Sequence, residues 1–233
     1  MNKQKTIVIS LGGSIICPST NKINTAFLKK FRALILSFIK RGYKFVIISG
    51  GGKIARLYQK SANKITKVSP ENQDWIGISA TKLNACLLRA IFADKACPVI
   101  FDSPHKKVKK YLLEKPVIIA SGWKPGFSTD YDAVLLAKRF KLKEVINAGN
   151  ISFVYDKDPK KYKNAHAFKK INWADYQKII SSKWIPGLST PFDPVATKMA
   201  KKLKMRAIII LGTDIKNFEK VLQGDNFKGT IIE

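Results

Sequence analysis

Glycine clusters directly follow short apolar runs at three places in this 233-residue chain. Thr6–Leu11 (TIVISL) ends in Gly12-Gly13-Ser14, and Lys44–Ser49 (KFVIIS) ends in Gly50-Gly51-Gly52. A third run, residues 117–120, precedes a loop that holds Gly122 and Gly126. Continuous apolar runs of this length predict strands that are buried on both faces, as in parallel sheets. We therefore expect three glycine-rich loops beyond the carboxyl ends of parallel strands, where ligands bind in open α/β folds.

Predicted strands and helices alternate along almost the whole chain. The expected strands cover residues 6–11, 44–49, 98–101, 117–120, 144–147, 207–211 and, at a sheet edge, 229–232. The expected helices cover residues 24–41, 53–62, 74–94 (or 79–94), 103–114, 130–140, 173–180, 194–204 and 214–222. Residues 63–73, 151–170 and 181–192 are expected to be loops or irregular. This order predicts an α/β fold, a three-layer αβα sandwich with a mostly parallel central sheet. We expect a single domain over residues 1–233, with an N-terminal lobe of about 1–140 and a C-terminal lobe of about 141–233.

The composition excludes several classes of protein. Apolar residues make up 45% of the chain and charged residues 25%, which are ordinary values for a globular protein. No run approaches the roughly 18 consecutive apolar residues of a membrane span, and the polar N-terminus lacks the layout of a secretory signal. Cys17, Cys86 and Cys97 fit neither a disulfide framework nor a metal site. We therefore expect a cytoplasmic protein with no membrane association.

The charge balance is strongly basic. Lysine and arginine number 43 against 16 acidic residues, so the formal net charge is +27. A field of this sign attracts phosphate-bearing ligands and nucleic acids. Only six of the 43 are arginines, the residue whose planar fork suits base and phosphate recognition, and the lysines are spread over the whole chain. We expect any binding to nucleic acid to be non-specific.

The glycine loops are suited to bind anions. Glycine lets backbone N–H groups approach phosphate oxygens closely, and each following helix directs its positive end at the same point. The chain contains no G-x-x-x-x-G-K-[ST] motif, and no G-x-G-x-x-G follows the first strand, which argues against P-loop kinases and dinucleotide-binding folds. Neither His105 nor His166 has metal-ligand spacing, and no serine stands in a G-x-S-x-G elbow.

Six segments, taken together, resemble the amino acid kinase family and, within it, the archaeal-type uridylate (UMP) kinase branch. They are residues 11–14 (LGGS), 50–53 (GGGK) with Arg56, 74–77 (DWIG), 122–130 (GWKPGFSTD), 155–160 (YDKDPK), and Asp193-Pro194 with Lys198. The resemblance implies the sandwich fold, phosphoryl transfer from ATP to UMP, Mg²⁺ as a cofactor with ATP, and a homo-oligomer, commonly a hexamer. It also makes the N-terminal lobe the acceptor lobe and the C-terminal lobe the ATP lobe.

The resemblance further implies roles for individual residues. Those implied in catalysis are Arg56, Asp130 and Lys198. Those implied in ATP binding are Gly13, Ser14, Gly52, Arg56, Gly149, Tyr155 and Asp158. Those implied in UMP binding are Gly51, Asp74, Trp123, Lys124, Pro125, Gly126, Phe127, Ser128 and Thr129. No protein ligand to a metal is implied. Asp132 is a rival to Asp130 for orienting the cationic groups, and Asp74 fits an ordinary helix N-cap equally well.

Two segments depart from the family pattern. Many members carry a catalytic lysine two residues before the first glycine, where this chain has Ser10. Lys53, Arg56 or Lys198 must then cover the phosphate charge. The usual Asn-x-Asp-Gly-Val-Tyr stretch reads Asn-Ile-Ser-Phe-Val-Tyr over residues 150–155, and Gly149 stands where threonine is usual.

These departures keep two alternatives open. One is another branch of the family with a different acceptor, such as an isopentenyl phosphate kinase. Such an enzyme is expected to place a histidine near the acceptor phosphate, and the glycine loops here contain none. The other is a non-catalytic nucleotide-binding protein, which Ser10, Ser152, Phe153 and the net charge of +27 would suit.

Overall fold

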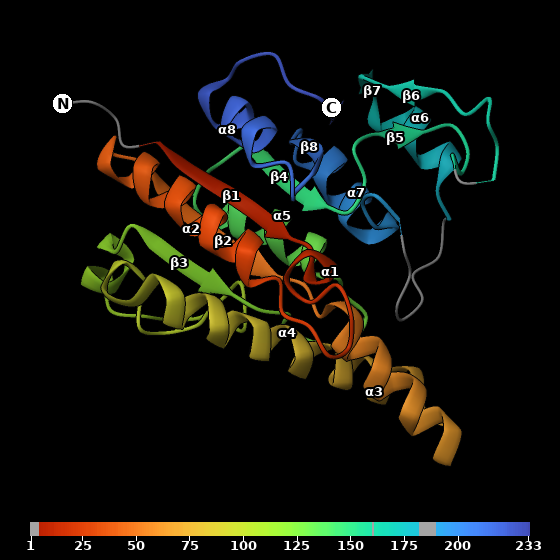
Figure 1. Ribbon diagram of the computed structural model, residues 1–233, viewed down its shortest axis with the longest axis horizontal. Coiled ribbons are helices and arrows are strands. Elements are labelled where there is room, and N and C mark those ends of the chain that lie inside the picture. The colour runs from red at the N-terminus through yellow and green to blue at the C-terminus, as the bar shows by residue number, and fades with distance from the viewer. Residues whose placement is uncertain (1–4, 160, 182–189) are drawn as a thin grey trace.

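The computed structural model describes residues 5–159, 161–181 and 190–233. Its centre is a seven-stranded sheet of order β3-β2-β1-β4-β8-β9-β7 (Figure 1). The strands are β1 Thr6–Leu11, β2 Lys44–Ser49, β3 Val117–Ala120, β4 Glu144–Gly149, β7 Lys170–Ile171, β8 Arg206–Leu211 and β9 Thr230–Ile232. All neighbouring pairs are parallel except β8 with β9. A separate antiparallel hairpin joins β5 (Val154–Tyr155) to β6 (Ala167–Phe168).

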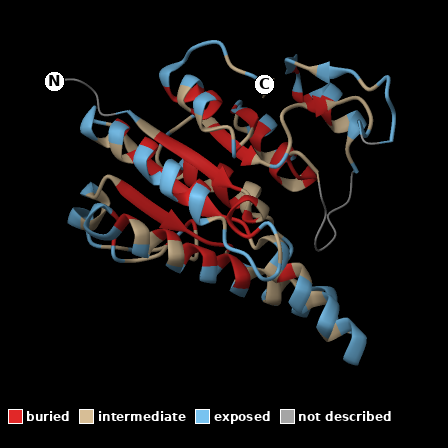
Figure 2. Ribbon diagram, viewed as in Figure 1, coloured by how far each residue is buried: buried red, intermediate tan, exposed pale blue. Residues whose placement is uncertain are grey.

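Helices cover both faces of the sheet, which confirms the predicted α/β sandwich. They are α1 Gly13–Ile16, α2 Thr25–Lys40, α3 Gly52–Ile65, α4 Pro70–Phe92, α5 Thr129–Arg139, α6 Trp173–Ile179, α7 Pro194–Lys202 and α8 Ile215–Gln223, with 3₁₀ turns η1 Ala93–Lys95 and η2 Lys110–Glu114. One buried cluster joins the sheet to α2, α4 and α8, and a second joins the other face to α5, α6 and α7. Figure 2 shows the long central strands β1 and β2 almost entirely buried and the helices buried on their inner faces, whereas the short strands β6 and β7 are partly exposed.

The two strands that precede the first glycine clusters have the predicted bounds. In β1, Ile7 and Ile9 pack into one buried cluster and Val8 into the other, so the continuous apolar run is explained by burial on both faces. The parallel register pairs Leu11 with Ser49, which places the two glycine loops side by side at one edge of the sheet.

The segment between α4 and β3 differs from prediction. Residues 98–101 form no strand; Ala96 and Phe101 make only isolated bridges to β3. Residues 103–114 form no basic helix beyond the 3₁₀ turn η2. Pro98 and Pro104 each lack a backbone N–H, and the closely spaced lysines of this stretch repel one another in a helix.

The C-terminal part differs further. Residues 151–170 contain the β5–β6 hairpin and the first residue of β7, where the sequence predicted irregular structure. The last strand, β9, is not at the sheet edge, because β7 pairs with its outer side. These strands have two or three residues, which is too short for any periodic pattern.

Helix α4 begins earlier than predicted. The Ser69 side chain accepts the N–H of Asn72, and Pro70 takes the first helical turn, so α4 starts at Pro70 instead of Asp74 or Ser79. Among the described residues, this is the helix long and apolar enough to cross a membrane by length and composition. One face of it, which includes Ala85, Leu88 and Phe92, is buried and packs against β2 and β3, as expected of a helix that covers a sheet.

Candidate active site

A cavity of about 610 Å³ opens at the carboxyl ends of β1, β2 and β4, and we call it the glycine cavity. Its lining includes the predicted residues Gly13, Ser14, Gly51, Gly52, Arg56, Asp74, Phe127, Ser128, Thr129, Asp130, Gly149, Tyr155 and Asp158. The predicted residues outside this lining are Trp123, Lys124, Pro125, Gly126 and Lys198. The fold thus brings residues from the whole length of the chain to one place.

The floor of the cavity is bare backbone. A Cβ atom on Gly13 would collide with the backbone of Gly50 and Gly52, and a Cβ on Gly52 would collide with the backbone of Gly13. Gly52 also has φ +68°, which L side chains rarely adopt. The loops after β1 and β2 therefore touch directly. Helix α3 begins at Gly52, so its positive end faces the cavity.

Asp130 lies at the centre of a hydrogen-bond network in this cavity. Ser10 Oγ donates to its Oδ1 at 2.8 Å, and Asn147 Nδ2 donates to the same oxygen at 2.8 Å. Burial of the carboxyl group and, to a smaller extent, the charge of Asp193 raise the pKa of Asp130 to about 7, with the Ser10 hydrogen bond partly opposing both. Position 10 thus provides a neutral donor to a carboxyl group, where many family members have a lysine.

A second carboxylate, Asp193, ties together the N-termini of two helices. It caps α7 by accepting the N–H groups of Val195 at 2.7 Å and Ala196 at 3.0 Å. It also accepts the hydroxyl of Ser128, which in turn caps α5. Burial raises the pKa of Asp193 as well. Both helices therefore direct their positive ends at the cavity.

Asp132, the sequence-level rival of Asp130, lies elsewhere. It is 1% exposed, does not line the cavity, and accepts the N–H of Trp123 at 3.1 Å. Its Oδ1 has no hydrogen-bond partner among the described residues, and burial raises its pKa to about 7. The geometry places Asp130 on the cavity and Asp132 behind it, where it anchors the loop that precedes α5.

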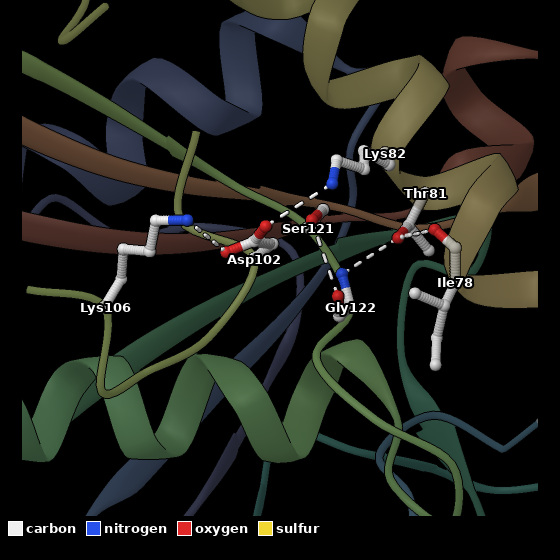
Figure 3. Close-up of polar contacts among 7 residues, drawn as sticks. All are labelled: Ile78, Thr81, Lys82, Asp102, Lys106, Ser121 and Gly122. Atoms are coloured by element: carbon white, nitrogen blue, oxygen red, sulfur yellow. Dashed lines mark hydrogen bonds and ion pairs between the residues drawn. The ribbon is translucent and has the colours of Figure 1, made fainter. Parts of the chain in front are cut away.

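That loop, residues 122–128, is held at three points. Thr81 Oγ1 accepts the N–H of Gly122 at 2.8 Å and donates to Ile78 O at 2.6 Å, as Figure 3 shows beside Asp102 and its ion pairs with Lys82 and Lys106. Asp74 Oδ2 accepts the N–H of Gly126 at 2.7 Å. Asp132 holds Trp123. Two of these anchors come from α4, so Asp74 is a residue within this helix and does not cap it.

Stacked aromatic rings stiffen the same loop. Trp123 stacks on Phe127 at 5.8 Å between ring centroids, and Phe127 stacks on Tyr131 at 4.5 Å. Lys124 Nζ lies 4.4 Å from the Trp123 ring centroid. Of these side chains only Phe127 lines the cavity, so Trp123 and Lys124 support the loop from outside.

The opposite wall of the cavity comes from the loop after β4 and from the β5–β6 hairpin. Gly149, Ile151, Phe153, Tyr155 and Asp158 line it, and the Phe153 and Tyr155 rings meet edge to face at 6.4 Å. Lys198 is exposed on α7, and Lys160 of the predicted YDKDPK segment lies outside the described residues.

Sequence reasoning missed several side chains of this lining, among them Thr81, Asn147 and Lys157. A signal existed for Asn147, because a polar residue near the carboxyl end of a buried strand points to a ligand site. Among the described residues, the cationic side chains in the lining are Arg56 and Lys157.

Comparison with known proteins agrees with the sequence motifs. Residues 5–211 match the model of the amino acid kinase family. The uridylate kinase of Archaeoglobus fulgidus is 35% identical over 229 residues, which cover 97% of this chain and 99% of that protein. The uridylate kinase of Methanoregula boonei is 32% identical over 221 residues, covering 94% and 91%.

Solved structures show the same likeness in three dimensions. The crystal structure of the Archaeoglobus fulgidus uridylate kinase superposes with a TM-score of 0.81 at 31% identity, covering 98% of this chain and 100% of that one. The Bacillus anthracis UMP kinase, at 21% identity and a TM-score of 0.79, shares the fold and covers 98% and 96% of the two chains. Motifs, cavity and relatives agree, and the chain belongs to the amino acid kinase family.

Proposed function

We propose that this chain is a uridylate kinase, which transfers the γ-phosphoryl group of ATP to UMP and yields ADP and UDP. The observation that carries the proposal is the glycine cavity. Its floor is the contact between Gly13 and Gly52. One wall includes Asp74 and the loop 122–128, and the other includes the loop after β4 and the β5–β6 hairpin. Two nucleotides that enter from the two walls meet with their phosphates over this floor. The archaeal relatives named as uridylate kinases, aligned over nearly the whole chain, support UMP as the acceptor.

On the acceptor wall, Asp74 and the loop 122–128 bind UMP. Phe127, Ser128 and Thr129 line the cavity directly and contact the nucleotide, while Trp123, Lys124, Pro125 and Gly126 shape the loop from behind. Gly51 approaches the acceptor phosphate. This distribution refines the roles that the sequence motifs imply, because only part of the loop faces the cavity.

On the donor wall, Gly149, Tyr155 and Asp158 bind the nucleoside of ATP, and Phe153 adds an aromatic surface beside Tyr155. Gly13, Ser14 and Gly52 approach its phosphates through backbone N–H groups. The N-terminus of α3 adds its positive end at the same place.

The reaction requires positioning and charge neutralisation more than covalent help. The acceptor is itself a phosphate and is already ionised near neutral pH, so no strong general base is needed. Arg56 neutralises developing charge on the transferred group, and Lys157 lies on the same lining. Lys198 must move its side chain from the exposed face of α7 to take part, so its catalytic role stays a prediction. Asp130 orients Ser10 and Asn147 at the phosphates.

Magnesium is the expected cofactor with ATP. The described residues contain no group of three or more His, Cys, Asp or Glu side chains that could hold a metal ion by themselves. The phosphate oxygens of ATP would therefore provide most of the ligands, with Asp130 and Asp193 as carboxylates on the same cavity. The ion would neutralise charge on the β- and γ-phosphates.

We also propose that the enzyme is a cytoplasmic homo-oligomer, a hexamer by family resemblance. Large apolar side chains that α3 and α4 leave exposed support a subunit interface there: Leu57, Tyr58, Ile65, Trp75 and Leu83. We retain as proposals the division into an acceptor lobe of about 1–140 and an ATP lobe of about 141–233, and the expectation that nucleic acid binds only non-specifically.

Steady-state turnover with ATP and UMP, CMP, TMP or isopentenyl phosphate tests the function. We expect UMP to give the highest kcat/KM. Higher turnover of isopentenyl phosphate would assign the chain to another branch of the family. Ser10 at the usual lysine position favours the second alternative, a non-catalytic nucleotide-binding protein. Binding of both nucleotides without turnover, or binding of RNA with a steep salt dependence, would support that alternative.

A further inference from the structure

A second cavity, of about 810 Å³, lies at the opposite end of the sheet from the glycine cavity. We call it the amino-end cavity. It is lined by Lys5, Thr6, Ile7, Leu142, Lys143, Glu144, Asn172, Trp173, Ala174, Lys201, Lys204, Met205, Arg206 and Glu233. These residues surround the starts of β1, β4 and β8, and none of them lines the glycine cavity. The volume is within the range of roughly 300–1,000 Å³ that is typical of small-molecule sites.

Two turns of the same kind lie at this end of the sheet. After α5, Lys141 adopts φ +57° and Leu142 N donates to Ala137 O at 2.8 Å. After α7, Lys204 adopts φ +50° and Met205 N donates to Ala200 O at 2.9 Å. This is the helix-ending turn in which glycine is favoured at the left-handed position. The chain has lysine at both positions, although a side chain there strains the backbone.

Strained residues persist where the surrounding structure holds them, and they concentrate at ligand sites. Lysine is abundant throughout this chain, so its presence at a surface turn is unremarkable by itself. The informative observation is a lysine whose backbone adopts the left-handed conformation and whose residue also lines a cavity. Lys204 combines both features, whereas Lys141 lies outside the cavity lining.

The charges of the amino-end cavity are unbalanced. Its lining carries the cations Lys5, Lys143, Lys201, Lys204 and Arg206 and the carboxylates Glu144 and Glu233. Both carboxylates are already engaged, Glu144 by Arg206 and Glu233 by Lys170. Within the described chain, none of the four lysines of the lining pairs with a carboxylate. Three of these lysines have other partners: Lys143 Nζ donates to Leu203 O at 2.8 Å, Lys201 Nζ donates to Gln177 Oε1 at 3.2 Å, and Lys5 Nζ lies 5.4 Å from the Tyr43 ring centroid. Lys204 is therefore the lysine of the lining best placed to meet an anion, and the positive excess around it favours one.

The same lining provides an apolar wall. Leu142 and Met205 follow the two strained lysines, and Trp173 packs beside them with its indole N–H donated to Met205 O at 2.8 Å. An inorganic anion would make no use of this wall. Lysine binds phosphate groups as a point charge, so the combination suits a phosphate group attached to an apolar or aromatic body.

We propose that the amino-end cavity binds an organic phosphate. Its phosphate group lies near Lys204, and its organic part lies against Leu142, Trp173 and Met205. This site is additional to the two nucleotides of the proposed reaction and does not depend on that function.

The two equivalent turns provide matched variants for the test. Lys204→Gly and Lys141→Gly each remove one lysine and relieve one strained position, so both should raise the Tm, by roughly 2–4 °C for a chain of this size. Calorimetric titration with phenyl phosphate, at fixed ionic strength, then measures binding to each variant. We expect Lys204→Gly to weaken binding about fivefold, as for an exposed charge pair, and Lys141→Gly to leave it unchanged.

Three further outcomes decide the proposal. If both variants bound phenyl phosphate equally more weakly than the parent protein, general charge attraction would explain the binding and the proposal would be overturned. Displacement of phenyl phosphate by saturating UMP and a non-hydrolysable ATP analogue would place the probe in the glycine cavity and also overturn it. Tighter binding of phenyl phosphate than of inorganic phosphate supports the apolar wall, whereas equal affinity contradicts the organic part of the proposal.

Discussion

The acceptor wall and the donor wall of the glycine cavity are built from different kinds of backbone. The acceptor wall follows the buried strands β2 and β3 and includes the 23-residue helix α4. The donor wall consists of the loop after β4 and a hairpin whose strands have two residues each. Buried strands and a long helix fix the first wall, whereas local turns shape the second. We therefore expect substitutions to be tolerated less well on the acceptor side than on the donor side.

Gly13→Ala tests the cavity floor, where the loops after β1 and β2 touch, against the local turns of the donor wall, and it is the most severe of the tests. Its Cβ would collide with the backbone of Gly50 and Gly52, which cannot rotate away as a side chain does. We expect a loss of stability of about 3 kcal/mol or more and loss of activity, measured by chemical denaturation and turnover. The control is Gly149→Ala on the donor wall, whose Cβ would lie 3.4 Å from Asn147 Oδ1. Equal damage from both substitutions would contradict the contrast.

Arg56→Ala tests the charge at the centre of the cavity. We expect kcat/KM to fall about 10²-fold, because the guanidinium stabilises charge that develops during transfer. Lys53→Ala is the matched control, since Lys53 is exposed on the same helix and lies outside the cavity lining. An unchanged rate for Arg56→Ala would remove it from catalysis and leave Lys157 as the cation to examine.

Asp130→Asn tests the buried carboxyl group between the two walls, through the pH dependence of protein stability. The pKa of Asp130 is about 7 in the folded protein, against an ordinary value of 3.8. Between about pH 4 and 7 the folded protein therefore holds a proton that the unfolded chain has released, and stability falls as the pH rises through this window. We expect Asp130→Asn to be more stable than the parent protein by about 4 kcal/mol at pH 8 and similar to it at pH 4.

The stability comparison needs a control for net charge. Asp225→Asn changes the charge equally at an exposed position and should leave the pH dependence of unfolding unchanged. If Asp130→Asn and Asp225→Asn behaved alike in denaturation at both pH values, the Asp130 carboxyl would be an ordinary solvated group. Turnover is a separate readout. If the Asp130 carboxyl orients the site, turnover by Asp130→Asn should fall whatever the result of the stability comparison.

Asp74→Asn tests the acceptor wall alone. Its carboxylate holds the Gly126 N–H, so an amide at this position weakens the anchor of the loop that binds UMP. We expect the KM for UMP to rise about tenfold and the KM for ATP to change little. An equal rise in both KM values would show that Asp74 acts on the whole cavity.

Phe153→Ala tests the donor wall and should have the smallest effect. Its ring meets Tyr155 edge to face and lines the cavity. We expect the KM for ATP to rise about fivefold, which is the low end for loss of one aromatic contact with a base. If Phe153→Ala raised the KM for ATP by a larger factor than Asp74→Asn raises the KM for UMP, the donor wall would tolerate substitution less well than the acceptor wall.

The same contrast explains how much could be predicted from the sequence. The bounds of β1 and β2 follow from six-residue, β-branched apolar runs that end in glycine, since such runs are too short for a typical helix. The glycines directly after these two strands lie at the predicted cavity, and Arg56 and Asp74, which the family resemblance implies, line it as well. The β5–β6 hairpin could not be predicted, because its pairing depends on contacts between residues more than ten positions apart.

Other errors had local causes. The start of α4 is readable in Ser69-Pro70, but a polar stretch that contains proline predicts a loop, because proline usually interrupts helices. The position of Lys198 could not be inferred, since a lysine near a helix N-terminus faces solvent or ligand according to the rotation of that helix. The hydrogen bond between Ser10 and Asp130 joins residues 120 positions apart, and no pattern in the sequence predicts it.

The contact between the loops after β1 and β2 also limits how this site can evolve. Where two side chains clash, a larger one can be compensated by a smaller neighbour. Here both neighbours already have the smallest residue, so a change at Gly13 or Gly52 has no second-site suppressor at the other position. Diversification of such an enzyme must therefore proceed through the surrounding loops, while the point where the two strands meet stays as it is.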